Sequence, residues 1–209
     1  MDIIDISWPI SHATTSYKDR NPVLFEDIKN FELDGVRETK IHLNSHTGTH
    51  IDAPWHFLKN GNTIEQMPLD TFIGRCTVVD MTSVTSGITH TDLEPISINP
   101  GDIILFKTTN SFLNPTDPFV HNFIYLEQSG AQYLAELKIK AVGIDYLGIE
   151  RNQPDHEKNI ILMEANIGIL EGLRLASVQA RNYTLIAFGL YTIGLEATPA
   201  RALLITSPL

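Results

Sequence analysis

Residues 44–57 read NSHTGTHIDAPWHF, and this stretch holds three of the eight histidines of a 209-residue chain. His46 and His50 flank Gly48, which lacks a side chain and so permits a tight bend that aims both imidazoles at one point. His50 and Asp52 are two residues apart, so an extended segment places them on the same face. The stretch therefore predicts a bend that leads into an extended segment, with three ligand-type side chains converging.

Two imidazoles and one carboxylate form a donor set that suits a divalent ion such as zinc or manganese. Three protein ligands leave positions open for water or substrate, which is typical of a catalytic ion. His56 lies four residues beyond Asp52, near the predicted ion but free to act as an acid or a base. Trp55 and Phe57 flank it with apolar surface able to exclude water or to stack on an aromatic substrate.

Four of the five histidines outside this stretch are not interpreted as metal ligands. His42 lies between apolar Ile41 and Leu43, so it either faces outward or supports a ligand from behind. The remaining isolated histidines are His12, His90 and His121.

Composition excludes several classes of protein. Lys plus Arg is 15 and Asp plus Glu is 25, so the net charge of −10 argues against a nucleic-acid or acidic-membrane partner. The single cysteine, Cys76, excludes an internal disulfide framework and a cysteine-based zinc cluster.

The N-terminus carries an acid at position 2 and no basic region, and no apolar run is long enough to span a membrane. We expect a cytoplasmic protein with one domain over residues 1–209.

The pattern of apolar residues predicts an α/β domain in which strands outnumber helices. Two segments have helical spacing, namely residues 126–137 and 156–165. Short runs rich in Val, Ile, Leu, Phe or Thr predict strands at residues 3–6, 37–43, 76–81, 102–108, 141–145, 183–188 and 202–206.

Residues 46–57 resemble the H-x-G-T-H-x-D-x-P-x-H-F signature of the cyclase family of metal-dependent hydrolases, which includes bacterial kynurenine formamidases and isatin hydrolases. Weaker family motifs follow in the expected order at residues 5–7, 101–105, 143–145, 169–173 and 199–201. The resemblance therefore extends over most of the chain. It implies a single swivelling β/β/α-type domain with a mixed sheet. It also implies a homo-oligomer, a dimer or tetramer, with sites near subunit contacts.

The resemblance also implies roles for individual residues. His46, His50 and Asp52 would hold one metal ion, and His56 would be the catalytic histidine. Glu171 and a histidine twelve residues before it would complete a second metal position that shares Asp52.

The chain departs from the family pattern at the second metal position. Asn159 stands where that histidine is expected, and an amide is a poor ligand for zinc although its oxygen can bind a harder ion. His156, three residues earlier, is an alternative ligand, so His156, Asn159 and Glu171 are candidates for a second ion or for substrate. We expect one ion per chain, with Glu171 facing it through water or bonded to His56. Residues 17–19 and 194–198 also differ from the family, which is expected to reshape the substrate pocket.

The function expected from this resemblance is hydrolysis of an amide bond in a small molecule. Candidate substrates are an N-formyl aryl amine, such as N-formylkynurenine, or a cyclic amide. The ion would polarise the carbonyl and activate water, His56 would carry the proton, and Glu171 would position the ion or water. Two alternatives stay open: a metal-binding or structural protein without turnover, and a cyclase or dehydratase of the same family.

Overall fold

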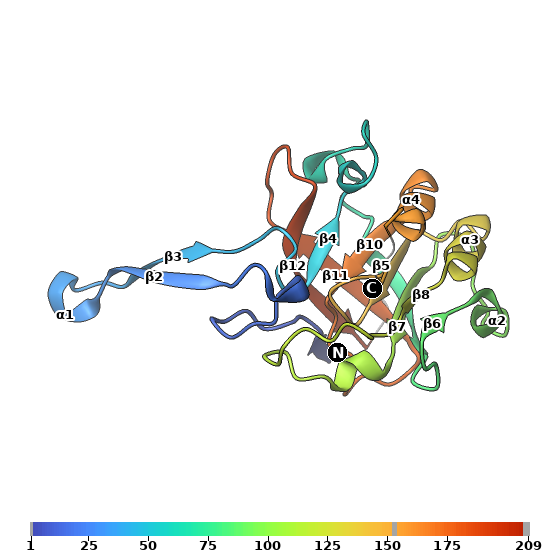
Figure 1. Ribbon diagram of the computed structural model, residues 1–209, viewed down its shortest axis with the longest axis horizontal. Helices are drawn as coiled ribbons and strands as arrows, with labels where there is room; N and C mark the ends of the chain where they lie inside the picture. The colour runs from blue at the N-terminus through green and yellow to red at the C-terminus, as the bar shows by residue number, and fades with distance from the viewer. Residues whose placement is uncertain (1, 152–153, 207–209) are drawn as a thin grey trace.

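Eight strands form the main sheet of the structure, a computed structural model that describes residues 2–151 and 154–206. Their order is β1-β12-β11-β5-β7-β9-β10-β4, and an additional pairing between β12 and β4 closes the sheet on itself (Figure 1). Their bounds are β1 (Ile3–Asp5), β4 (His50–Asp52), β5 (Ile73–Asp80), β7 (Ile103–Lys107), β9 (Ala141–Ile144), β10 (Gly168–Glu171), β11 (Asn182–Gly189) and β12 (Ala197–Ile205).

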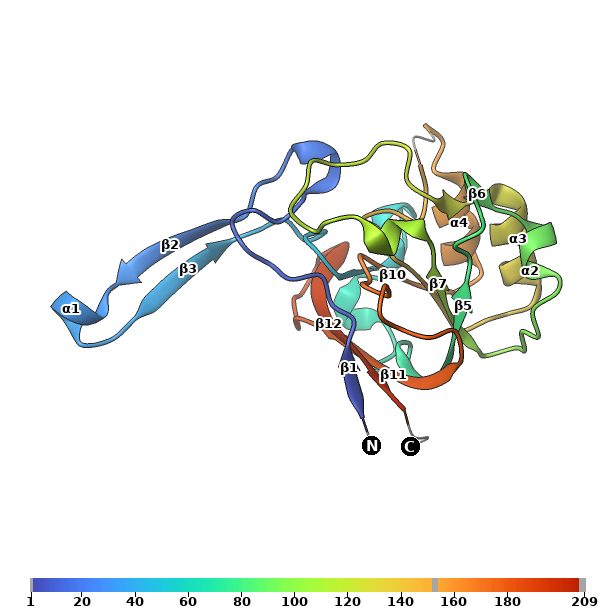
Figure 2. The ribbon, with the colours of Figure 1, turned by 90° about the horizontal axis from the view of Figure 1, so that it is seen from below.

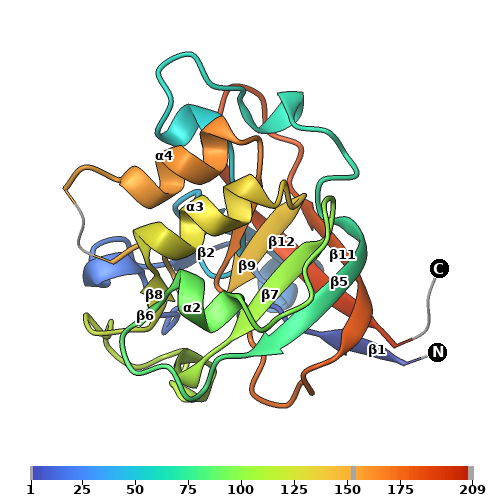
Figure 3. The same ribbon diagram turned by 90° about the vertical axis from the view of Figure 1, so that its right-hand side faces the viewer.

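The sheet is mixed, and helices cover one side of it. Strands β5, β7, β9 and β10 are parallel neighbours, whereas β1, β4, β11 and β12 form antiparallel pairs. Parallel neighbours need crossover connections, which here contain α2 (His90–Leu93), α3 (Gln128–Glu136) and α4 (Glu157–Glu164). Figure 3 shows these three helices gathered on one side. The expected α/β class with a mixed sheet is confirmed.

Strand β7 separates two apolar cores. Ile104 and Phe106 pack in the cluster that includes Leu134 of α3, whereas Ile103 and Leu105 belong to the cluster on the opposite face. Successive side chains of a strand point to opposite faces. A strand buried on both faces therefore reads as a continuous apolar run, and this is why β7 was recognisable in the sequence.

A hairpin projects far from the rest of the molecule (Figures 1 and 2). It consists of β2 (Leu24–Lys29), α1 (Phe31–Asp34) and β3 (Glu38–His42), and we call residues 24–42 the arm. Every residue from 30 to 44 is exposed. Beyond its base, where the Phe25 ring lies 4.9 Å from that of His12, the arm therefore receives little cover from the body of its own chain.

The expected elements occur with small changes at their ends. All seven expected strands and both expected helices are present. Helix α4 begins at Glu157 rather than at residue 156, because His156 adopts a left-handed backbone conformation with φ 50° and ψ 32°. The sequence patterns missed β2, β10, the short helices α1 and α2 and the two-residue strands at residues 87–88 and 125–126, and β4 was foreseen only as an extended segment.

Short elements complete the description. A two-stranded sheet pairs β6 (Gly87–Ile88) with β8 (Tyr125–Leu126). Single 3-10 turns lie at Tyr17–Asp19, Pro54–His56, Ile64–Gln66 and Thr109–Phe112. Within the described residues, none of the helices has the length and apolar character needed to cross a membrane.

Candidate active site

Strand β4 carries the predicted ligands into the closed part of the sheet. It lies between β10 and β12, with His50 opposite Glu171 on one side and Pro199 on the other. Asp52 lies opposite Ile169 and Ala197 in the same two pairings. The closure of the sheet thus brings Glu171 to the side of His50, although 121 positions separate them along the chain.

The loop before β4 is held by a close backbone contact. Gly48 and Gly172 both have positive φ angles, 63° and 69°. A Cβ atom on Gly172 would lie 2.2 Å from the carbonyl oxygen of Gly48. The buried Thr49 hydroxyl accepts from the Trp8 N–H at 2.7 Å and donates to the Gly172 carbonyl at 2.6 Å. These contacts fix the bend that the sequence predicted at Gly48.

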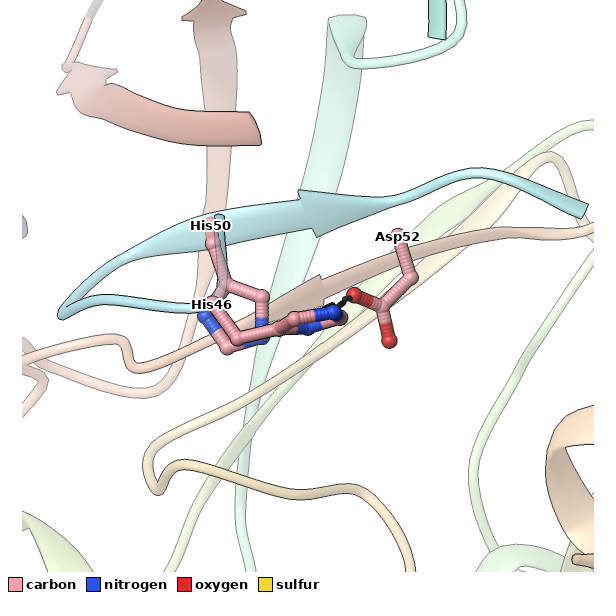
Figure 4. A group of neighbouring side chains, drawn as sticks. All are labelled: His46, His50 and Asp52. Carbon is pink, nitrogen blue, oxygen red and sulfur yellow. Dashed lines mark ion pairs between the residues drawn. The ribbon is translucent and has the colours of Figure 1, made fainter. Parts of the chain in front are cut away.

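His46, His50 and Asp52 converge as expected. One ligand atom from each lies within 4.8 Å of the others, and Figure 4 shows the two imidazoles next to the carboxylate. The Asp52 Oδ1 atom is 3.1 Å from His46 Nδ1 and 3.6 Å from His50 Nε2. His50 Nδ1 lies 2.9 Å from the Gly48 carbonyl oxygen. If Nδ1 donates there, the lone pair of Nε2 is free for a metal.

The atoms at the centre of this group lack partners. His50 Nε2 and Asp52 Oδ1 are buried and have no hydrogen-bond partner. A buried polar atom left unpaired costs about 1–3 kcal/mol. Among the described residues, no lysine or arginine forms an ion pair with Asp52 or Glu171. The donor set therefore fits a divalent cation both in chemistry and in charge.

The pKa values of His50 and Asp52 also indicate that positive charge is stabilised at this site. Burial disfavours the charged form of His50, but the carboxylates of Glu171 and Asp52 outweigh it and raise the pKa of His50 to about 9. Burial acts to raise the pKa of Asp52, yet the neighbouring imidazoles of His46 and His50 lower it. A bound cation would supply the positive charge that a proton on His50 supplies otherwise.

Glu171 supports His50 rather than His56. Its Oε1 atom accepts from the Ile149 N–H at 2.6 Å, and its Oε2 atom lies 3.2 Å from His50 Nε2. The side chain is buried. Of the two alternatives expected for Glu171, the bond to His56 is not formed, because β4 and β10 are neighbours and place Glu171 beside His50; contact with an ion through water stays a prediction.

His56 lies next to the group at the end of the turn Pro54–His56. Its ring centroid is 4.4 Å from that of His46 and 4.0 Å from that of Phe57. Burial lowers the pKa of His56, and the Asp52 carboxylate opposes this only in part. The imidazole is therefore neutral near pH 7 and able to accept a proton. Trp55, in contrast, is 45% exposed and does not line the cavity described next.

A cavity of about 630 Å³ opens over these side chains. Its volume lies within the usual range for small-molecule sites, about 300–1,000 Å³. Tyr17, Phe57 and Leu147 contribute apolar surface to its lining. His56 and the three predicted ligands also line it. A small molecule in the cavity would contact all the residues that the sequence singled out for chemistry.

His156 and Asn159 also reach this cavity, but not the His46–His50–Asp52 group. His156 Nδ1 pairs with Glu150 Oε1 at 3.0 Å, and its ring stacks 4.7 Å from Phe57. The side chain of His156 is half exposed, whereas Asn159 on α4 is buried.

Two acidic residues near the site were missed by sequence reasoning. Glu150 follows strand β9, and the carboxyl ends of parallel strands are where ligands bind in open α/β sheets, so that signal was available. Glu196 Oε1 is 3.4 Å from His46 Nε2 and accepts from the Ser45 hydroxyl at 2.6 Å. Only the pairing of β12 with β4 brings Glu196 there, so the local sequence could not reveal it.

Comparison with known proteins agrees with this description. Residues 4–151 match the model of the family described as "Putative cyclase", and the chain belongs to this family. A kynurenine formamidase from Salinibacter ruber is 29% identical over 211 aligned residues, covering 100% of this chain and 99% of the relative.

Solved structures share the fold. A potential metal-dependent hydrolase with cyclase activity is 39% identical, with a TM-score of 0.89 over 97% of this chain and 96% of that one. Isatin hydrolase A from Ralstonia solanacearum superposes with a TM-score of 0.85 at 20% identity, covering 99% of this chain and 92% of that one. At that identity, the second likeness supports the fold alone.

Proposed function

We propose that this protein hydrolyses an amide bond of a small molecule, an N-formyl aryl amine or a cyclic amide. In this proposal His46, His50 and Asp52 hold one divalent ion per chain, zinc or manganese. The observation that carries the proposal is the pair of buried, unpartnered atoms His50 Nε2 and Asp52 Oδ1 beside His56. The similarity to a kynurenine formamidase supports the substrate class.

The residues around the ion have separate roles in the proposed reaction. A divalent ion at this position supplies Lewis-acid polarisation of a carbonyl and makes water more acidic. His56 accepts the proton of the attacking water, because its lowered pKa keeps it neutral. His56 then returns the proton to the leaving nitrogen of the amide. Glu171 is a positioning residue that fixes His50 from the adjacent strand.

The cavity is suited to a flat, apolar substrate. The Phe57 ring makes tilted contacts with the rings of His56 and His156, whose centroids are 4.0 and 4.7 Å away. Tyr17 and Leu147 line the same cavity. An aryl group packed among these side chains would leave its amide facing the histidines.

Metal removal and reloading test the proposal. The purified protein is stripped with a chelator and reloaded with zinc or manganese, and hydrolysis of N-formylkynurenine and of isatin is followed spectroscopically. We expect turnover of one of them, its loss on chelation and its recovery on reloading. A protein that loses thermal stability on chelation but never turns over either substrate has a structural ion instead. A product formed without consumption of water would indicate a cyclase or dehydratase.

A further inference from the structure

The cavity wall contains two unpartnered atoms that the metal group does not explain. Of the six buried side-chain atoms without a partner in the described residues, four belong to residues that line this cavity. His50 Nε2 and Asp52 Oδ1 lie at the metal group. The other two are Glu150 Oε2 and Asn159 Oδ1.

These two acceptors belong to one local structure. Glu150 follows β9 and Asn159 lies in α4, and the backbone amide of Asn159 acts to lower the pKa of Glu150, so the two residues are neighbours. His156 Nδ1 occupies Glu150 Oε1 at 3.0 Å, so Oε2 remains available. The residues are 7% and 5% exposed. Each therefore carries the cost of a buried acceptor without a donor.

The free atoms are too few for a second metal ion. Two protein oxygens would leave magnesium or calcium held mostly by water, and zinc prefers nitrogen and sulfur ligands to an amide oxygen. Glu171 belongs with the metal group instead, because its Oε1 accepts from the Ile149 N–H and its Oε2 faces His50 Nε2 at 3.2 Å. One carboxylate oxygen and one amide oxygen instead match an N–H donor group.

Charge favours a cationic donor. Asp52, Glu150 and Glu171 line the cavity, and Lys18 is the one lysine or arginine among its lining residues. A divalent ion would balance Asp52 and Glu171, whereas Glu150 has only Lys158 and, when it is protonated, His156 as cationic neighbours. Burial raises the pKa of Glu150, and the charges of His156 and Lys158 offset this only in part. A charge-assisted hydrogen bond from a ligand would stabilise the ionised carboxylate.

We propose that Glu150 and Asn159 form a subsite that binds an ammonium group of the substrate. The inference rests on the proposed function, since it names a feature of the substrate cleaved in the same cavity. The amide would lie at His56, the aryl group against Phe57 and the ammonium group at Glu150. The subsite would select amines over neutral molecules of the same shape.

A matched pair of substrates tests the subsite. Formanilides carrying either an aminoethyl or a neutral propyl side chain are compared by kcat/KM with the metal-loaded protein. We expect a preference of about tenfold or more for the amine, as charged hydrogen bonds provide. Glu150→Gln and Asn159→Leu should each reduce this ratio by about tenfold, mostly through KM. Glu164→Gln removes a charge from the exposed far end of α4 and should leave the ratio unchanged.

Binding measurements separate this proposal from the proposed function. Calorimetry with phenethylamine and 2-phenylethanol needs no turnover, so Glu150-dependent binding of the amine supports the subsite even if neither formanilide is cleaved. Equal binding of both compounds would overturn it. Equal losses of kcat/KM for the two formanilides in Glu150→Gln would show that Glu150 has a structural role. Manganese binding that depends on Glu150 would show a cation site instead. Unfolding temperatures confirm that the variants are folded.

Discussion

At the scale of single residues, His50 is the ligand held most firmly by its surroundings. It is buried, its Nδ1 lies 2.9 Å from the Gly48 carbonyl, and its Nε2 faces Asp52 and Glu171. His50→Ala should weaken metal binding by more than the roughly 10–100-fold that changes around ligands cause. Metal titration followed by elemental analysis measures this. His42→Ala, which removes an exposed histidine paired with Glu26, should retain the metal. Full occupancy in His50→Ala would show that the site lies elsewhere.

His56 should behave differently from the ligands. His56→Ala is expected to keep the metal and to lower kcat by about 10²–10⁴, the usual contribution of a general acid or base. The reason is that its ring packs beside His46 and Phe57 and its pKa is lowered by burial. Parallel measurements of kcat and metal content decide the matter, with exposed His90→Ala as the control. Loss of the metal would make His56 a ligand.

Asn159 determines the number of ions in this account. Asn159→His places an imidazole in α4, in the same cavity as Glu171 and Asp52. We expect the stoichiometry to rise from one ion per chain towards two, because an imidazole is a good zinc ligand and an amide is not. Titration with zinc under calorimetry measures the count, and Asn159→Gln serves as the amide control. Two tight equivalents in the unaltered protein would contradict the prediction.

The residues of the site differ in how well the sequence reveals them. His46, His50, Asp52 and His56 lie within one short segment, so their spacing alone predicts that they meet. Glu171 comes close only because β10 pairs with β4, and spacing along the chain carries no such information. Its link to the site came from the resemblance to a family, and its contact with His50 came from the structure.

At the scale of elements, the close contact between Gly172 and Gly48, which holds the loop before β4, can be tested. Gly172→Ala would force a left-handed backbone on alanine and place its Cβ 2.2 Å from the Gly48 carbonyl oxygen. We expect a loss of roughly 2–5 kcal/mol in the free energy of unfolding, together with weaker metal binding. Gly35→Ala has almost the same φ, 68°, with nothing within 4 Å. This control should cost only the backbone strain, about 1–2 kcal/mol. Equal losses in chemical denaturation of both variants would refute the packing argument.

Strands with continuous apolar runs were the clearest in the sequence. Every residue of β9 and the first four of β7 are buried, so their apolar runs are unbroken. Strand β2 escaped notice because its residues are nearly all exposed and carry charges. Strand β10 has only four residues, and residues 169–173 were singled out only as a family motif, so no strand was predicted there. Burial was not decisive by itself, because the fully exposed β3 was predicted and the fully buried β10 was not.

At the scale of the whole molecule, the order of strands could not be read from the sequence. The ring is closed by β4, a strand of three residues that contacts both β10 and β12. Pairings between distant segments depend on the complete set of neighbours, which periodicity does not contain. The class of fold was accessible because alternating strands and helices favour an α/β arrangement.

The arm raises the question of assembly. An isolated two-stranded hairpin is at best marginally stable in water, yet the arm exposes Phe31, Leu33 and Ile41 at 56%, 84% and 57%. The body exposes a second apolar surface at residues 188–195, where Leu190 and Tyr191 are 61% and 82% exposed beside a cavity of about 350 Å³. We propose that the arm packs against this surface of a second copy, which gives a homo-oligomer, a dimer or tetramer.

The double variant Phe31→Ser and Leu33→Ser tests this assembly. Each buried apolar side chain contributes about 1.5–3 kcal/mol, so losing two should weaken association by at least about 100-fold. Sedimentation over a range of concentrations should show the unaltered protein as an oligomer and the variant dissociating at much higher concentration. Ile3→Ser removes an equally exposed apolar side chain from β1, away from the arm (Figure 2), and should not change assembly. If the unaltered protein is a monomer, the arm does not contact a second copy. The same conclusion follows if the double variant assembles as tightly as an oligomeric unaltered protein.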